Sequence, residues 1–265
     1  MKRYLAIAAH CFRIQIVYRY EVLMNLLEIV GRTVFAWVLW SAIYADRELV
    51  GGFTLPAMLL YSLLSAFLSS LDLSEGVSGE TSARIRDGTF SRYMVLPTNT
   101  QLQFIAQYMG TSAFYALFAG VVTGLCAASL RIGLPFAAGI PAVLCALAMI
   151  PLGLVMMVCF HFCIATLTFK YQDIDFFLRV QGALLAFATG GIVPLILLPA
   201  GVLSVLRFVP FIHVVYTPAM LLMGKLTLAD GAAGLAVLTV WTATLAALGQ
   251  LMFKRLRTKY DGVGI

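Results

Sequence analysis

Three short patterns in this chain hold residue types that can do chemistry. The string CFHFC contains Cys159, His161 and Cys163, and thiol and imidazole groups are common zinc ligands. On a helix, positions 159 and 163 share one face while position 161 points nearly opposite, so the three side chains cannot converge on one ion. We therefore predict that this string packs in a core and that the chain holds no metal.

The second pattern, Gly76-Val77-Ser78-Gly79, resembles the GxSG nucleophile string of rhomboid-type intramembrane proteases. Ser78 would be the nucleophile and would need a histidine from a neighbouring helix to take its proton. The last apolar segment, from Gly231 to Phe253, contains no histidine. We therefore expect no catalytic residue here, and a rhomboid-like protease remains only an alternative.

The third pattern is Glu28 and Arg32, which lie four residues apart in an apolar stretch. On a helix this spacing lets the two side chains meet and neutralise each other. An ionisable residue inside a membrane span is nevertheless a functional candidate by default. Two interpretations stay open: a structural ion pair, or a part of the substrate pathway or of a dimer seam.

The composition is that of an integral membrane protein: 62% of the residues are hydrophobic, 11% are charged, and the mean hydropathy is +0.95. A helix needs about 20 apolar residues to cross a bilayer. The chain has six windows of that kind: Val22 to Ala45, Leu49 to Leu71, Tyr93 to Leu130, Ile132 to Phe169, Val180 to Leu206 and Gly231 to Phe253.

The predicted fold is therefore an all-α integral membrane protein with six transmembrane helices in one permease domain, residues 1–265. Residues 1–20 are predicted to form an interfacial helix, because apolar residues share one broad face and basic residues suit anionic headgroups. A frayed cytosolic tail is the alternative. The five cysteines fall mainly within spans, which favours apolar packing over disulfide bonds.

The window after about residue 190 cannot be one straight helix, because prolines and glycines interrupt it. We expect a fifth span over about 174–190, followed by broken re-entrant or outer helices over 191–226 that form an outer gate. Two additional full spans are the alternative. The predicted gate residues are Gly190, Gly191, Pro194 and Pro199.

Orientation follows from the 18 Lys and Arg residues, since cytosolic segments near spans retain positive charge. With the N-terminus inside, 13 of these residues are cytosolic, four face out and Arg32 lies within a span. We therefore predict a multi-pass protein of the cell membrane with both termini in the cytosol. The net charge of +6 then requires no nucleic-acid partner.

The long polar passage of the interior contains RIRDGTFSRYMVLP, which resembles the cytosolic loop of permease subunits from the type-2 class of ABC exporters. In that family an aliphatic residue, a basic or polar residue, an optional acid, a glycine, an aromatic residue and a proline lead into the third span. The resemblance covers the whole chain, although Arg84 stands where the family often has an acid. The matching residues are Ile85, Arg86, Asp87, Gly88, Tyr93 and Pro97.

The resemblance implies that residues 76–97 form a coupling segment that docks in a groove of a separate ATPase subunit. Ile85, Phe90 and Tyr93 would be apolar anchors, and the arginines would pair with acids of the partner. Gly88 would permit the turn, and Thr89 would cap the helix after it. A solvated loop is the alternative. The predicted partner-binding residues are Arg84, Ile85, Arg86, Asp87, Gly88, Thr89, Phe90, Arg92 and Tyr93.

The chain has no phosphate-binding loop of the GxxxxGK[ST] type, so it is not itself expected to be an enzyme or to bind a cofactor. The resemblance implies an exporter that moves a hydrophobic drug, toxin or lipid-like substrate out of the cytosol, with ATP and Mg held by the partner ATPase. A second permease, identical or related, would complete a dimer. An ATP-independent channel or carrier is the alternative.

Overall fold

The computed structural model describes residues 2–132, 139–171, 174–191 and 194–259, and these residues form helices without any strand. Five helical stretches are long and apolar enough to cross a membrane. The protein is therefore a multi-pass membrane protein. The five stretches are α2 (Arg19–Ile43), α3 (Leu55–Ser70) together with α4 (Glu75–Arg86), α6 (Thr100–Ser129), α7 (Ile140–Tyr171) and α11 (Leu228–Leu256).

The expected fifth span corresponds to α8 (Asp175–Ala188), which has 14 residues. This is shorter than the roughly 20 residues that a straight helix needs to cross a bilayer. The described residues therefore confirm an all-helical membrane protein, with five helical stretches of spanning length and, at the place of the expected fifth span, the shorter helix α8.

The second stretch is interrupted at residues 71–74, between α3 and α4. Asp72 accepts hydrogen bonds there from the backbone N–H of Ser74 (3.1 Å) and from its hydroxyl (2.6 Å). Such local bonds from Asp or Asn offer the backbone an alternative to helical hydrogen bonds. The second span is thus two helices that are free to differ in direction, with a carboxylate at the junction.

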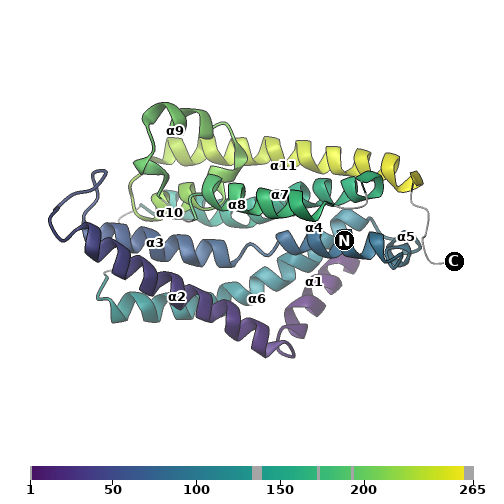
Figure 1. The fold of residues 1–265 in the computed structure, drawn as a ribbon, viewed down its shortest axis with the longest axis horizontal. Coiled ribbons are helices and arrows are strands. Elements are labelled where there is room, and N and C mark those ends of the chain that lie inside the picture. Colours follow the sequence, from purple (N-terminus) through teal and green to yellow (C-terminus); the bar gives the residue numbers. More distant parts are fainter. Residues whose placement is uncertain (1, 133–138, 172–173, 192–193, 260–265) are drawn as a thin grey trace.

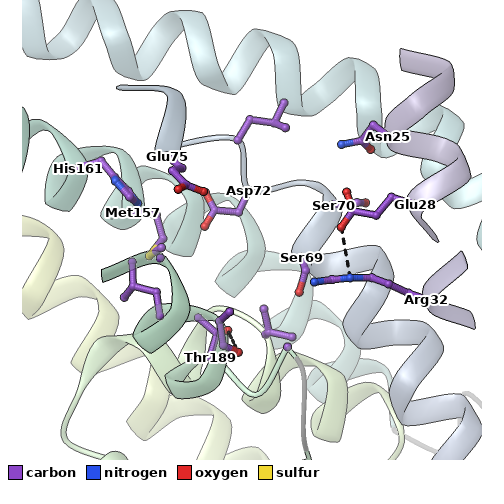
Figure 2. A pocket seen from close by; sticks show the side chains of 16 residues that line it. Asn25, Glu28, Arg32, Ser69, Ser70, Asp72, Glu75, Met157, His161 and Thr189 are labelled. Atoms are coloured by element: carbon purple, nitrogen blue, oxygen red, sulfur yellow. Dashed lines mark hydrogen bonds and ion pairs between the residues drawn. The ribbon is translucent and has the colours of Figure 1, made fainter. Parts of the chain in front are cut away.

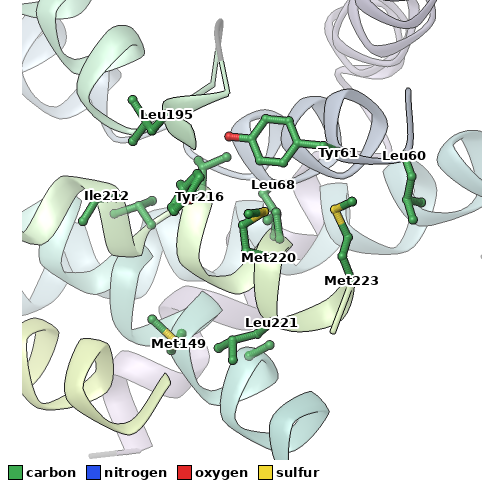
Figure 3. Close-up of a cluster of buried hydrophobic side chains, with 14 of the residues drawn as sticks. Leu60, Tyr61, Leu68, Met149, Leu195, Ile212, Tyr216, Met220, Leu221 and Met223 are labelled. Atoms are coloured by element: carbon green, nitrogen blue, oxygen red, sulfur yellow. The ribbon is translucent and has the colours of Figure 1, made fainter. Parts of the chain in front are cut away.

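The core lies around α7, which packs against α11, α4, α10 and α6. Its buried residues include Met149, Met156 and Phe162, so apolar burial rather than polar contact holds the centre of the bundle. Figure 3 shows Met149 near Leu221, a residue that follows the prolines and glycines of the fifth window.

The segment between α8 and α11 is broken into short pieces, as predicted: η1 (Leu195–Leu197), α9 (Ala200–Leu206), η2 (Pro210–His213) and α10 (Tyr216–Leu222). None of these exceeds seven residues, so the alternative of two further full spans is wrong. The helix α10 is buried in the core, which agrees with the rule that irregular backbone at membrane depth is covered by protein.

The first helix, α1 (Lys2–Ile14), has no buried residue and packs along α6. Gly110 of α6 permits a close approach, because a Cβ at that position would collide with the backbone of Ala8. The rings of Phe12 and Phe114 meet edge to face at 5.3 Å. The predicted N-terminal helix is therefore formed, and its place at a membrane interface stays a prediction.

The ends of the bundle differ in the segments that they carry. Figure 1 shows α1, α5 (Ser91–Met94) and the C-terminal end of α11 at one end, and the loop between α2 and α3 at the other. The segments predicted to be cytosolic thus lie together. Which side of the membrane they face remains a prediction.

Candidate functional site

The chain reverses direction between α4 and α5 at Gly88, whose φ of +74° lies in the left-handed region. The Phe90 N–H donates to the Arg84 carbonyl at 2.9 Å and closes the end of α4. The predicted turn is confirmed. The predicted cap is wrong: Phe90 occupies the N-cap position of α5, and the Thr89 hydroxyl instead donates to the Arg84 carbonyl at 3.5 Å.

The apolar residues of the predicted coupling segment point into the protein. Phe90 has no exposed surface and lies 5.3 Å from the Tyr93 ring, 5.4 Å from Phe169 and 6.2 Å from Phe253, between ring centroids. We call this region the aromatic cluster, and its members are Val77, Ile85, Phe90, Tyr93, Phe104, Val158, Phe162, Phe169 and Phe253.

This burial corrects one expectation from the sequence. Ile85, Phe90 and Tyr93 were expected to anchor a partner, but in the described structure they pack against α7 and α11. The reason is physical: a four-residue helix has too little surface to hide a phenylalanine by itself, so α5 folds back onto the bundle. These residues fix the predicted coupling segment to the helical bundle.

Arg84, another predicted partner-binding residue, also makes contacts within the chain. Its guanidinium forms an ion pair with Glu80 and donates a hydrogen bond to the Tyr93 hydroxyl. Burial raises the pKa of Tyr93, and the nearby Arg84 opposes that shift. Arg84 thus connects α4 to α5. It stands where the family that the sequence resembles often has an acid, and in this chain it pairs with Glu80.

The surface of the segment is made by other residues. Val95 is 80% exposed and Leu96 is 42% exposed, directly after α5. Both lie in the predicted segment 76–97, but they were not among its predicted partner-binding residues, because they also fall in the apolar window that begins at Tyr93. The following Pro97 was the signal that the helix had not yet begun. We call this surface the coupling surface: Arg86, Asp87, Thr89, Arg92, Val95 and Leu96.

A second candidate region is a cavity of about 290 Å³ between α2, the α3–α4 junction, α7 and α8 (Figure 2). We call it the polar cavity. Glu28 and Arg32 both line it, and they form the expected ion pair with Nε and Oε1 3.3 Å apart. Its other residues are Asn25, Ser69, Ser70, Asp72, Leu73, Glu75, Met157, His161, Gly182, Leu185, Ala186, Thr189, Gly191 and Val215.

The Glu75 carboxylate enters this cavity beside α8. A Cβ at Gly182 would lie 3.2 Å from Glu75 Oε1, so the glycine leaves the room that the carboxylate needs. Glu75 is also the first residue of α4, whose far end carries the coupling surface. Sequence reasoning passed over Glu75 and Asp72 because they stood just beyond an apolar window.

Ser78 has a histidine neighbour after all, contrary to the expectation. His161 Nδ1 lies 3.0 Å from Ser78 Oγ, and this histidine comes from α7 instead of the last span. Ser78 is fully buried, and its hydroxyl lies 2.9 Å from the Glu75 carbonyl, an acceptor that competes with the imidazole for the hydroxyl proton. The pair is a buried structural contact.

The side chains of the CFHFC string point in different directions, as predicted. Cys163 Sγ faces α11 and lies 3.4 Å from the Leu245 carbonyl, whereas His161 faces Ser78 of α4. Within the described residues, no group of three His, Cys, Asp or Glu side chains is placed to hold a metal ion.

The predicted gate residues mark the end of α8. Gly190 has a φ of +79°, and its carbonyl accepts hydrogen bonds from Tyr61 (2.8 Å) and Ser65 (3.2 Å) of α3. Tyr61 and Ser65 were not singled out in the sequence. Pro194 and Pro199 directly precede η1 and α9. The break is thus held by α3, and a gating role stays a prediction.

Comparison with known proteins identifies the family. The model of a family described as ABC-2 family transporter protein matches residues 30–264. No curated protein and no solved structure matches the chain. Because the family match covers most of the chain and the structure is a bundle of membrane-spanning helices, the protein belongs to the ABC-2 transporter family as a membrane permease.

Proposed function

We propose that this chain is the membrane subunit of an ATP-driven exporter and that a separate ATPase subunit binds the coupling surface. The observation that carries the proposal is that residues 84–97 contain both buried residues, which anchor the segment, and exposed residues, which can contact a partner. Ile85, Phe90 and Tyr93 fix the segment to the bundle, while Arg92, Val95 and Leu96 face outward. A partner can therefore push on the segment without detaching it.

The proposed path of force runs along α4. Its C-terminal end carries the coupling surface, and its N-terminal end is Glu75 in the polar cavity. The interruption at residues 71–74 separates α4 from α3, so α4 can move together with α7 while α3 stays with α2 and α6. Such a two-body arrangement suits alternating access of a site to the two sides of a membrane.

The partner ATPase would hold ATP and Mg, and this chain would bind no cofactor. A second permease, identical or related, would complete the transporter in the cell membrane, with both termini of this chain in the cytosol. The Gly190 break and its hydrogen bonds to α3 would form the outer gate. The substrate would be a hydrophobic drug, toxin or lipid-like molecule.

The test replaces the exposed residues and spares the buried ones. The variant Val95→Asp with Leu96→Asp removes the apolar contact, and the separate variant Arg92→Glu reverses a charge. Losing an interface anchor of this kind costs about 1 to 4 kcal/mol, so recovery of an ABC ATPase with the purified permease should fall about tenfold or more. Thermal unfolding of the permease should not change.

The matched control is Leu49→Asp, an exposed apolar residue in the loop at the opposite end of the bundle. It should leave ATPase recovery and substrate export unchanged. Full ATPase recovery and ATP-dependent export with both coupling-surface variants would reject the proposal. Transport by vesicles that contain this chain without any ATPase would favour the channel or carrier.

A further inference from the structure

The polar cavity carries carboxylates without matching cations. Arg32 is committed to Glu28 at 3.3 Å, whereas Asp72 and Glu75 form no ion pair within the described residues. Carboxylates within a membrane protein are costly unless a charge or hydrogen bonds compensate them. Among the described residues, Asp72 receives hydrogen bonds only from Ser74 of its own turn, so a positively charged group could still pair with its carboxylate.

His161 adds an acceptor to the cavity in one of its two neutral tautomers. When the Ser78 hydroxyl donates to the Glu75 carbonyl at 2.9 Å, Nδ1 of His161 donates its proton to Ser78 Oγ at 3.0 Å. In the neutral ring this leaves Nε2 as an acceptor. His161 is 2% exposed and lines the cavity, and Nε2 has no hydrogen-bond partner in the described part of the chain.

The neighbouring Gln181 fits the same tautomer. Its Nε2 is drawn 3.4 Å from His161 Nδ1, while its Oε1 is buried and has no partner among the described residues. The two ends of an amide side chain are assigned from the hydrogen-bond network. Rotating the Gln181 amide turns Oε1 toward the Nδ1 proton and gives that buried oxygen a donor.

Other side chains of the lining also offer acceptors. Asn25 lines the cavity, and its Oδ1 is buried without a partner in the described structure. The hydroxyls of Ser70 and Thr189 donate to carbonyls of their own helices, at 2.7 and 3.3 Å, which leaves their lone pairs for a ligand. A ligand that suits this cavity therefore brings several N–H donors as well as a positive charge.

The rest of the lining is apolar. Met157 of α7, Leu185 and Ala186 of α8 and Val215 contribute this apolar surface. Figure 2 shows His161 and Met157 on the same side as Glu75, with Arg32 and Glu28 across the cavity. An apolar body with one cationic head would match both kinds of wall.

We propose that the polar cavity binds the protonated amine of an amphiphilic substrate. Asp72 and Glu75 supply the opposite charge, and His161 Nε2 and Asn25 Oδ1 accept N–H hydrogen bonds. The inference deepens the proposed export function, on which its physiological meaning rests. It also places the substrate beside the first residue of α4, the helix that carries the coupling surface.

The experiment measures binding to the purified permease in lipid nanodiscs without an ATPase. The probes are octylamine, which is a cation with N–H donors at neutral pH, octyltrimethylammonium, which is a cation without donors, and octanol, which is neutral. A ligand that binds the native state raises the unfolding temperature in a saturable way. Octylamine should bind about tenfold more tightly than the other two probes, because charge-assisted hydrogen bonds are worth that much.

Two variants test the residues. Glu75→Gln and Asp72→Asn keep size and hydrogen-bonding capacity but remove the charge, and each should weaken octylamine binding about tenfold. The matched control Glu48→Gln, in the exposed loop before α3, should bind like the native protein. Equal shifts with all three probes, or octylamine affinity that neither cavity variant changes, would overturn the proposal.

The two proposals can fail separately. Loss of octylamine preference would reject the amine site while leaving ATPase recovery at the coupling surface untouched. Failure to recover an ATPase would reject ATP-driven export, yet the isolated permease would still distinguish octylamine from octyltrimethylammonium.

Discussion

The aromatic cluster and the polar cavity both include residues of α4 and α7, on different faces of these two helices. On α7, Phe162 lies in the cluster and its neighbour His161 lines the cavity. On α4, Val77 belongs to the cluster and Glu75 belongs to the cavity. The cluster buries rings against rings, whereas the cavity holds Asp72 and Glu75 without an ion pair, and Asn25 Oδ1 without a hydrogen bond, within the described residues.

This difference implies that the aromatic cluster mainly affects the stability of the fold and that the polar cavity mainly affects ligand binding. A buried side chain that contacts only other apolar groups is not available to bind a ligand. Its removal leaves a cavity in the core and lowers the free energy of unfolding. A polar group without a partner costs free energy in the empty protein, and that cost is recovered when a ligand arrives. Substitutions in the two regions should therefore affect different measurements.

The largest effect is expected for Phe90→Ala in the aromatic cluster. Removing a fully buried ring that contacts Tyr93, Phe169 and Phe253 should lower the free energy of unfolding by about 3 to 5 kcal/mol. The measurement is thermal or denaturant unfolding of the purified permease. Arg92→Ala, two residues away and exposed, is the control and should stay within about 0.5 kcal/mol.

Octylamine binding sharpens this test. If the comparison holds, the fraction of Phe90→Ala that folds should bind octylamine with native affinity, since no ring of the cluster lines the polar cavity. A Phe90→Ala protein of native stability would break the comparison, because it would mean that the ring is not needed to hold α5.

A smaller effect is expected for Arg32→Ala at the wall of the cavity. The substitution leaves the Glu28 carboxylate without its partner at 3.3 Å, and an unpaired charge in a membrane helix costs up to about 3 kcal/mol. The folded yield should fall. Replacing both residues, Glu28→Leu with Arg32→Leu, should restore the yield because no charge is left unpaired.

Transport by the double variant then decides between the two interpretations of this pair. Native export would make the pair structural. A well-folded double variant without export would place Glu28 and Arg32 in the substrate pathway, which their position in the cavity lining favours.

Much of the fold follows from apolar length and from helix breakers. The windows beginning at Val22, Tyr93, Ile132 and Gly231 each contain one long helix, and the prolines after Gly190 divide the following segment into short pieces. The short α8 and the helical run from Glu75 to Arg86 could not be predicted in this way. Charged residues end an apolar window, but they do not end a helix.

The sites were harder to predict, because residue type does not say which face of a helix a side chain occupies. Phe90 and Tyr93 have the types expected of interface anchors, yet tertiary packing buries them. Ser78 and His161 are 83 residues apart, so no local spacing indicates that they meet. Gly88 is the exception, since a left-handed turn favours glycine wherever it occurs.

The smallest effect, and the one that joins the two regions, is expected for Ser78→Ala. The substitution removes hydrogen bonds to the Glu75 carbonyl and to His161, at 2.9 and 3.0 Å, and should cost about 1 kcal/mol of unfolding free energy. Thr81→Ala is the control on the same buried helix, because the Thr81 hydroxyl has no partner among the described residues and its loss should be nearly neutral.

The informative readout for Ser78→Ala is octylamine affinity. Without the Ser78 hydroxyl, the Gln181 amide can donate to His161 Nδ1, which moves the ring proton to Nε2 and turns that acceptor into a donor facing the amine. Affinity for octylamine should therefore fall in Ser78→Ala and stay native in Thr81→Ala. If both variants bind octylamine equally well, the tautomer of His161 does not matter for the cavity, and the Ser78 contact serves only to pack α4 against α7.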